Sequence, residues 1–379
     1  MELKKILVGL EGLKAKGNLD LDITGLESNS KNIKEGYMFI AIKGYSVDGH
    51  DYINNAIEAG AKVVMVQEGC DLKKIKLPAD VTIIMAKDTR EALAICSCNF
   101  YGNPSRKFKL IGVTGTKGKT TTTFMIKEIL EKSGKKVGLI GTIATYINGK
   151  KIKDNDRTTP ESLELQQIFA QMVKEGVEVV VMEVSSQSLK LHRVDGCNFD
   201  IVLFTNFSED HIGGVEHKDM EEYLQCKQML FKQCRFGAVN CDDAVWKRMI
   251  DGNTCENIAT FGFSDIADYH ASKEHLISKP GYLGVHFQLD GKCDLQVDVA
   301  IPGKFSVYNA LAAITACSYF PVKQEHVLKG LDTVKVKGRV EMIPVDGPYT
   351  LLIDYAHNAV SMESLLKTLK EYHPNRIIC

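Results

Sequence analysis

The feature that most constrains the fold of this chain is a glycine-rich segment between an apolar run at residues 110–113 and a helix-like run at residues 122–132. Its residues are Gly115, Thr116, Lys117, Gly118, Lys119, Thr120 and Thr121. A glycine-rich turn between a strand and a helix directs backbone N–H groups at one point beside the positive end of the helix dipole, which binds phosphate. The segment therefore predicts an α/β fold that binds a nucleoside triphosphate, with Lys119 on the β- and γ-phosphates and the Thr120 hydroxyl on Mg²⁺.

One position departs from the strict phosphate-loop pattern, which has glycine where this chain has Val113. The alternative interpretation is an ordinary strand, turn and helix with a solvated lysine. We favour nucleotide binding, because the glycines, Lys119 and Thr120 all follow the strand–loop–helix order that phosphate binding needs.

Composition excludes several classes of protein. A hydrophobic share of 44% and a charged share of 25% are typical of a globular protein, and a net charge of −1 gives no broad basic surface for nucleic acid or an anionic membrane. The 11 cysteines are scattered and form no Cys-x-x-Cys pair, which favours reduced thiols over a zinc site. No signal sequence or membrane-spanning run is present, so we expect a cytoplasmic protein that binds neither nucleic acid nor membrane.

The chain divides into three regions. Residues 1–105 indicate a small α/β domain, with strands at 38–42 and 61–66. Residues 106–335 alternate strands and helices around the glycine-rich loop, and their nearly continuous apolar strands predict a buried parallel sheet, followed by short strands from about 255. Residues 336–379 contain one helix and two strands, too little for a domain core, so we expect the beginning of an incomplete domain.

Three further residues are candidates for chemistry. Glu183 ends an apolar strand at 179–183, and beside a phosphate loop we interpret it as a second Mg²⁺ ligand. His211 follows another buried strand and is either a metal ligand or a helix cap. Lys227 lies in an amphipathic helix at 221–231, and the periodicity alone indicates a solvated lysine.

The ordered motifs resemble the Mur ligase family, ATP-dependent enzymes that join an amino acid or peptide to a carboxylate. The resemblance covers essentially the whole chain, and it is nearest to the MurE-type branch, which adds a diamino acid. The motifs that carry it are Thr158-Thr159-Pro160-Glu161-Ser162, Glu183-Val184-Ser185-Ser186, His192-Arg193, Asp210-His211, Asp354-Tyr355-Ala356-His357 and, in the first region, Ser28-Asn29-Ser30-Lys31.

The resemblance implies a three-domain architecture. An N-terminal α/β domain would bind the UDP part of the substrate, a central domain with a parallel sheet would hold ATP, and a C-terminal Rossmann-like domain would be incomplete here. The family continues for roughly another domain's length beyond Cys379, and that part selects the amino acid. The sequence therefore leaves meso-diaminopimelate and L-lysine both open.

The resemblance also implies roles for single residues. Ser30 would contact UDP, Glu183 and His211 would bind Mg²⁺ with Thr120, and Lys227 would be carbamylated so that it can orient Mg²⁺. Asn309 would contact the nucleotide base, and Arg339 an ATP phosphate. The residues implied for the muramoyl-dipeptide are Thr158, Thr159, Ser185 and Arg193.

The expected activity is that of a peptidoglycan-precursor ligase. ATP would phosphorylate the D-Glu carboxylate of UDP-MurNAc-L-Ala-D-Glu, and the amine of a diamino acid would attack the acyl phosphate. We expect a monomer. The alternatives are a ligase similar to folylpolyglutamate synthetase, a nucleotide-binding module without turnover, and a phosphate-loop kinase. The first region and Thr158-Thr159-Pro160 argue against the folylpolyglutamate alternative.

Overall fold

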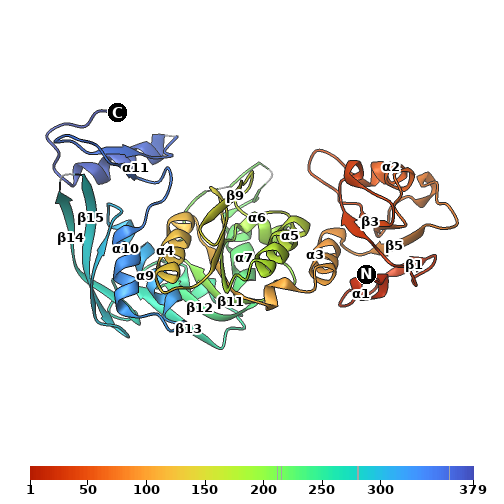
Figure 1. The fold of residues 1–379 in the computed structure, drawn as a ribbon, viewed down its shortest axis with the longest axis horizontal. Coiled ribbons are helices and arrows are strands. Elements are labelled where there is room, and N and C mark those ends of the chain that lie inside the picture. The colour runs from red at the N-terminus through yellow and green to blue at the C-terminus, as the bar shows by residue number, and fades with distance from the viewer. Residues whose placement is uncertain (211, 215, 280, 358) are drawn as a thin grey trace.

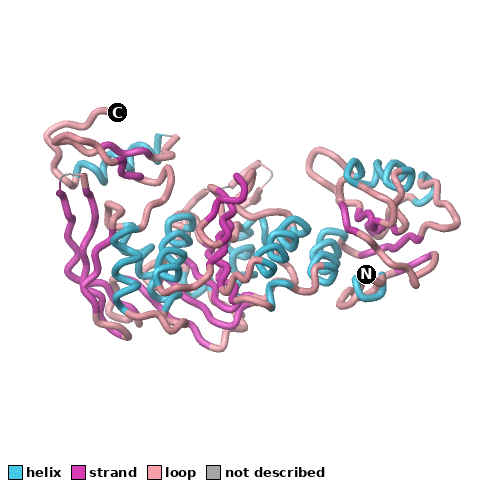
Figure 2. The backbone as a smooth tube through the Cα atoms, in the orientation of Figure 1, coloured by secondary structure: helices cyan, strands magenta, loops and turns pink. Residues whose placement is uncertain are grey.

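The structure is a computed structural model that describes residues 1–379 except 211, 215, 280 and 358. Three groups of elements follow one another along an elongated molecule, with the N-terminus and the C-terminus in opposite end groups (Figure 1). Helices line both sides of a large central sheet, and a smaller sheet forms the N-terminal group (Figure 2). None of the helices in the described part of the chain has the length and apolar character to cross a membrane.

The N-terminal group is a small α/β unit. Residues 1–105 are all described and form a five-stranded sheet in the order β1-β5-β4-β3-β2, in which only β1 is antiparallel to its neighbour. The expected strands at 38–42 and 61–66 are confirmed as β3 and β4. The strands are β1 (Lys14–Lys16), β2 (Gly25–Glu27), β3 (Tyr37–Ile40), β4 (Val63–Gln67) and β5 (Thr82–Ala86). The helices are α1 (Leu3–Ile6), α2 (Ile53–Glu58) and α3 (Thr89–Phe100), with 3₁₀ turns η1 (Ser30–Asn32), η2 (Gly49–Tyr52), η3 (Leu72–Lys74) and η4 (Pro104–Arg106).

The central group is built on a mixed sheet. Within the described residues it has eleven strands in the order β16-β15-β14-β13-β12-β11-β6-β10-β7-β8-β9. The strands from β14 to β7 in this order are parallel, as the apolar runs predict, and antiparallel strands extend both edges. The strands are β6 (Lys109–Thr114), β7 (Val137–Ile140), β8 (Ala144–Ile147), β9 (Lys150–Asp154), β10 (Val179–Glu183), β11 (Phe199–Phe204), β12 (Cys234–Asn240), β13 (Asn257–Gly262), β14 (Tyr269–Lys279), β15 (Tyr282–Gly291) and β16 (Leu295–Val299).

Helices cover both faces of this sheet. Alternate residues of β6 show the two faces: Ile111 packs with α4, α9 and α10, whereas Leu110 packs with α5 and α7. Both faces of the parallel strands are therefore buried, which explains their nearly continuous apolar sequences. The helices are α4 (Lys119–Lys132), α5 (Ser162–Lys174), α6 (Ser186–Lys190), α7 (Met220–Phe231), α8 (Trp246–Met249), α9 (Phe305–Cys317) and α10 (Gln324–Thr333).

The last group is small. The short strands β17 (Glu341–Ile343) and β18 (Leu351–Ile353) pair antiparallel, and α11 (Ala359–Lys370) follows them. This group lies beyond the tips of the β14–β15 hairpin in Figure 1. The domain boundaries expected at 105/106 and 335/336 remain predictions, although each falls between two of these sheets.

One expectation about the central group is wrong. The sequence after residue 255 suggests short strands, but β14 and β15 contain 11 and 10 residues and form a long hairpin. The turn residues that bound this region of the sequence do not indicate how long the strands between them are.

Candidate active site

The glycine-rich loop connects β6 to α4, as predicted. Gly115 and Gly118 have φ angles of 145° and 86°, which other residues rarely adopt. A Cβ atom on Gly115 would overlap the Thr205 hydroxyl, and one on Gly118 would overlap the Asn309 amide. The backbone therefore makes a tight turn into α4, whose N-terminus has no side-chain cap among the described residues. Val113, the departure from the strict pattern, is a fully buried core residue of β6 and lies before the turn.

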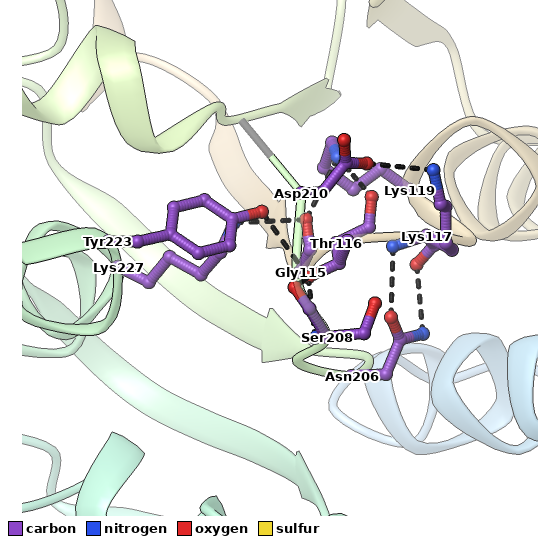
Figure 3. A network of polar contacts seen from close by, with 9 residues as sticks. All are labelled: Gly115, Thr116, Lys117, Lys119, Asn206, Ser208, Asp210, Tyr223 and Lys227. Atoms are coloured by element: carbon purple, nitrogen blue, oxygen red, sulfur yellow. Dashed lines mark hydrogen bonds and ion pairs between the residues drawn. The ribbon is translucent and has the colours of Figure 1, made fainter. Parts of the chain in front are cut away.

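The loop is held by residues that follow β11. Asn206 accepts a hydrogen bond from the Lys117 amide at 2.9 Å and donates one to the Lys117 carbonyl at 3.0 Å (Figure 3). The Thr116 hydroxyl donates to the Ser208 carbonyl at 3.3 Å, and the Lys117 ammonium lies 2.7 Å from an Asp210 carboxylate oxygen. The segment after β11 thus fixes the conformation of the phosphate-binding loop.

Two lysines meet at one carbonyl oxygen of the loop. Lys119 Nζ donates to the Gly115 oxygen at 2.9 Å and to the Thr116 oxygen at 3.1 Å, and Lys227 Nζ donates to the same Gly115 oxygen at 3.1 Å. Burial lowers the pKa of Lys119, and it holds the pKa of Lys227 well below its ordinary value, where the Lys119 charge lowers it further. Lys227 reaches the loop from α7 (Figure 3).

Lys227 is not the solvated lysine that helical periodicity indicates. Its side chain is 1% exposed, and its ammonium lies 4.3 Å from the centre of the Tyr223 ring, one helical turn earlier. Tyr223 stacks on Phe207, and its hydroxyl is 3.3 Å from the Thr116 hydroxyl. The prediction from periodicity is wrong because the Tyr223 ring and the Gly115 carbonyl bury the charged end of the side chain. An amphipathic pattern contains no information about such tertiary contacts.

Glu183 and Thr120 come together, as the two-ligand interpretation requires. The Thr120 hydroxyl donates to Glu183 Oε2 at 3.0 Å, and Thr142 donates from its amide and its hydroxyl at 2.8 and 3.1 Å. Glu183 is 1% exposed, and burial raises its pKa although Lys119 opposes that shift. Oxygen donors of this kind, on a phosphate loop, suit Mg²⁺. His211 lies outside the described residues, so its predicted place in this set stays a prediction.

The residues predicted for the dipeptide adjoin Glu183. The Thr159 hydroxyl donates to the Glu183 carbonyl at 2.9 Å and accepts from the Ser185 amide at 3.1 Å, and the Thr158 and Thr142 hydroxyls are 3.0 Å apart. Arg193 donates to the Thr159 carbonyl at 3.3 Å and pairs with Glu161 at 3.0 Å. Its buried Nε finds no hydrogen-bond acceptor among the described residues.

Of the remaining predicted residues, Asn309 lies beside the loop, and Arg339 and Ser30 lie in the other two groups of elements. Asn309, in α9, accepts a hydrogen bond from the Thr122 hydroxyl at 3.3 Å beside the loop. Arg339 lies 5.3 Å above the Tyr355 ring in the last group, lines a cavity of about 770 Å³, and its charge helps to lower the pKa of Lys119. Ser30 begins η1 in the N-terminal group, whereas the loop belongs to the central group.

Sequence reasoning missed several residues of this site. Thr142 lies two residues after β7. Glu183 was predicted because it is a polar residue at the end of a buried strand, and the same reasoning could have predicted Thr142. For Tyr223, the sequence indicates only that it lies one helical turn before Lys227. No sequence signal indicates that His217 Nε2 lies 2.8 Å from the Ser186 hydroxyl, with its ring packed 5.0 Å from that of Tyr223.

This combination of a phosphate loop, a buried carboxylate at the end of an adjacent parallel strand and a buried lysine facing the loop defines an ATP-using α/β enzyme. The chain belongs to the Mur ligase family of ATP-dependent ligases. Its residues 22–101 match the family's catalytic domain, residues 113–317 the Mur ligase middle domain, and residues 338–379 the glutamate ligase domain of the family.

Individual relatives agree with this assignment. The chain is 43% identical, over all of its length and 76% of the relative's, to a UDP-N-acetylmuramoyl-L-alanyl-D-glutamate–2,6-diaminopimelate ligase of Caldanaerobacter subterraneus. A solved structure of a ligase with that name, 23% identical, superimposes with a TM-score of 0.81 over 98% of this chain and 74% of its own. Folylpolyglutamate synthase of Mycobacterium tuberculosis shares the fold, with 18% identity and a TM-score of 0.60 over 74% of this chain and 70% of its own.

Proposed function

We propose that this protein is an ATP-dependent ligase that joins 2,6-diaminopimelate to UDP-MurNAc-L-Ala-D-Glu in peptidoglycan precursor synthesis. The observation that carries the proposal is the joint position of Lys119, Lys227 and the Glu183–Thr120 pair at the carboxyl end of the parallel sheet. We further propose that it acts as a monomer in the cytoplasm.

The phosphate loop and its neighbours bind ATP in this proposal. The backbone amides at the N-terminus of α4 and the Lys119 ammonium would offset the charge of the phosphates, whereas the Thr116 and Lys117 amides are bonded to Asn206. Asn309, beside Gly118, lies where it can contact the nucleotide, and Arg339 approaches from the last group. Each of these groups is positive or donates hydrogen bonds, as a triphosphate requires.

Thr120, Glu183 and His211 are the proposed Mg²⁺ ligands. The hydroxyl and the carboxylate already share a hydrogen bond of 3.0 Å, so a small shift lets both oxygens face one cation. When bound, the ion neutralises phosphate charge during phosphoryl transfer. Removing divalent cations with a chelator should therefore stop ADP formation, and adding Mg²⁺ back should restore it.

Lys227 is the proposed site of carbamylation. Only the neutral amine adds CO₂, and the burial that lowers the pKa of Lys227 raises the neutral fraction. The ammonium first loses one proton, and addition of CO₂ to the neutral amine then forms an N–C bond and releases a second proton. A cation that repels Lys119 thereby becomes an anion that attracts it. The product is a carboxylate directed at the loop, where it can orient Mg²⁺.

The dipeptide substrate would lie next to Glu183. Thr158, Thr159, Ser185 and Arg193 form one hydrogen-bonded cluster there, and Arg193 retains a buried donor, Nε, without an acceptor among the described residues. A guanidinium in this position suits a carboxylate of the substrate. Ser30 would contact the UDP part from the N-terminal group.

The proposed reaction has two steps. The D-Glu carboxylate oxygen attacks the γ-phosphorus of ATP, so that ADP leaves and an acyl phosphate forms. The amine of diaminopimelate then attacks the acyl carbon, and phosphate and a proton leave as the amide forms. The protein's part is to hold two anions together against their repulsion, which Lys119 and the loop amides do electrostatically.

The direct test compares two lysines on the same helix. With both substrates present, Lys119→Ala should lower ADP formation by at least about 100-fold, because an oriented charge at the phosphates is lost. Lys132→Ala, at the other end of α4, is the matched control and should leave the rate unchanged. Unchanged ADP formation in the Lys119 variant would contradict the assignment.

The amine and the carboxylate substrate are each tested by replacement. Replacing diaminopimelate with L-lysine should lower phosphate release markedly, and so should replacing UDP-MurNAc-L-Ala-D-Glu with a folate. Release that needs a folate would favour the folylpolyglutamate alternative, and ATP binding without any acceptor-dependent release would favour a nucleotide-binding module.

A further inference from the structure

Two cysteines lie side by side where α7 joins the central sheet. Cys234 begins β12, and Cys255 lies two residues before β13. These strands pair in parallel with Phe236 opposite Asn257, and continuing that register by two residues brings Cys234 opposite Cys255. Their sulfur atoms are 2.9 Å apart. Because a disulfide bond is about 2.05 Å long, the sulfurs need to approach by less than about 1 Å to bond.

Both thiols also contact the last residue of α7. The Cys234 and Cys255 sulfurs lie 3.8 and 3.6 Å from the Phe231 carbonyl oxygen, which also accepts a hydrogen bond from the Thr254 amide at 3.2 Å. Phe231 is one helical turn after Lys227. The pair therefore lies at the end of the helix that carries the buried lysine of the active site.

The two thiols differ in exposure and in acidity. Cys234 is buried, whereas Cys255 is partly exposed to solvent. The hydrogen bond between them lowers the pKa of Cys255, and the same bond together with burial raises the pKa of Cys234. Since the thiolate is the reactive form, Cys255 is the accessible nucleophile and Cys234 is placed to react second.

We propose that Cys234 and Cys255 form a reversible disulfide when the protein meets a hydroperoxide. The Cys255 thiolate attacks one peroxide oxygen, the O–O bond breaks, and hydroxide leaves, which gives a sulfenic acid. Cys234 then attacks the Cys255 sulfur, and the sulfenic oxygen leaves as water with the Cys234 proton. The two thiols lose two electrons in total, the peroxide gains them, and a small dithiol reverses the change.

In the part of the chain that the structure describes, the other cysteines lack either a neighbouring thiol or exposure to solvent, and this reaction requires both. Cys98 and Cys197 are also hydrogen-bonded to each other, but both are buried. Cys293 is partly exposed, but its hydrogen bond is to Gln324, and among the described residues it has no thiol neighbour. Proximity and access coincide at Cys234 and Cys255, so oxidation should be selective for this pair.

The disulfide would close a loop of the central sheet. It links residues 21 apart in the sequence, with α8 between them, and removes both S–H groups from the Phe231 carbonyl. Oxidation should therefore slow amide hydrogen exchange in residues 246–255, which the new bond restrains. This inference does not depend on the proposed ligase activity, because its readouts are chemical.

The first experiment maps the bond. The reduced chain is treated with stoichiometric hydrogen peroxide, the remaining thiols are alkylated, and the digest is analysed by mass spectrometry without reduction. A linked peptide containing Cys234 and Cys255 should be the main cysteine product and should disappear after dithiothreitol. Cys255→Ser should abolish it, whereas Cys293→Ser, the matched control, should leave its yield unchanged. Oxidation spread over other cysteines without this link would overturn the proposal.

The second experiment identifies the attacking sulfur, with dimedone as a probe for sulfenic acid. In Cys234→Ser the sulfenic acid at Cys255 has no partner, so peroxide and dimedone should label Cys255. In Cys255→Ser the buried Cys234 should remain unlabelled. Circular dichroism of both variants checks that they fold. Labelling of Cys234 with none at Cys255 would contradict the assigned order of attack.

Discussion

At the scale of single residues, the unusual feature is one carbonyl oxygen that accepts from two buried ammonium groups. Lys119 and Lys227 both donate to the Gly115 oxygen; burial lowers the pKa of each, and the Lys119 charge lowers the pKa of Lys227 further. Two buried like charges are costly unless an anion joins them. The arrangement therefore favours an anionic ligand at the loop, and it favours loss of the charge on Lys227.

The first residue-scale prediction concerns Lys227. Lys227→Ala should lower ligase turnover by at least about 100-fold, because a group oriented toward the loop is lost. If the side chain acts as a carbamate, acetate or another short carboxylic acid should restore part of the rate. Lys227→Arg keeps the charge but cannot form a carbamate in this way, so it should stay inactive with or without acetate. Full activity in the arginine variant would contradict the carbamate.

The second residue-scale prediction separates catalysis from stability at Glu183. Glu183→Gln keeps the shape, and it removes both the desolvation cost of a buried carboxylate and the charge that attracts Lys119. These two effects oppose each other, so the melting temperature should change little. Turnover should fall by about 100-fold or more, because the carboxylate that we propose as an Mg²⁺ ligand is gone. A matched control is Glu178→Gln, an exposed residue before the same strand, whose turnover should not change. Normal turnover in the Glu183 variant would exclude it as a ligand.

Sequence alone reached part of this site. The pairing of Glu183 with Thr120 was predictable, because buried parallel strands and a phosphate loop end at the same edge of a sheet. The burial of Lys227 was not, since it depends on Tyr223 and on a carbonyl more than a hundred residues away in the sequence. Contacts between residues so far apart in the sequence leave no recognisable pattern in any short segment of it.

At the scale of elements, the start of α7 positions Lys227. The Asp219 side chain caps the helix by accepting from the Glu222 amide at 2.8 Å, and Glu222 accepts from the Lys218 amide at 2.9 Å. Asp219→Ala should lower the free energy of unfolding by about 1 kcal/mol, measured by urea denaturation. Asp219→Asn, which can still cap, should cost clearly less, and equal losses in the two variants would contradict the capping role.

A second element-scale prediction concerns the turn after α6. His192 lies 2.6 Å from Asp195 and 4.0 Å from Asp88 at the start of α3, with Glu91 also nearby, and the hydrogen bond to Asp195 raises the pKa of His192. A raised pKa stabilises the fold below the ordinary histidine pKa, and this stabilisation is lost as the pH rises through the folded-state value. His192 also has a φ of 56°, which asparagine tolerates well.

His192→Asn therefore removes the charge without straining the turn. It should lower the free energy of unfolding by about 0.5–1 kcal/mol near pH 6, and the difference from the native chain should shrink toward pH 9. Urea denaturation at both pH values measures it. A difference that grows with pH would have the wrong sign and would exclude the histidine–aspartate pair as its source.

The sequence predicted elements better than their extents. The strand at 179–183 appears with those bounds, because an apolar run and its final carboxylate mark it clearly. The β14–β15 hairpin was expected as short strands, because its exposed residues interrupt the alternation. Its length depends on packing against β13 and β16, which no local window contains.

At the scale of the whole molecule, predicted site residues come from three separate groups of elements. Ser30 lies in the N-terminal group, the loop and Lys227 in the centre, and Arg339 in the last group. Sequence motifs predicted that these residues act together. They gave no information on the distances between the three groups, which depend on the fold. The proposed reaction thus requires one chain to bring UDP, the dipeptide end and ATP to neighbouring positions.

In the proposed reaction, the D-Glu carboxylate becomes an acyl phosphate at the loop. The most direct measurement labels that carboxylate of UDP-MurNAc-L-Ala-D-Glu with the heavy oxygen isotope and analyses the released phosphate by mass spectrometry. We expect one labelled oxygen in each phosphate, released only when ATP, Mg²⁺ and diaminopimelate are all present. Phosphate released without label, or at the same rate without the dipeptide substrate, would contradict it.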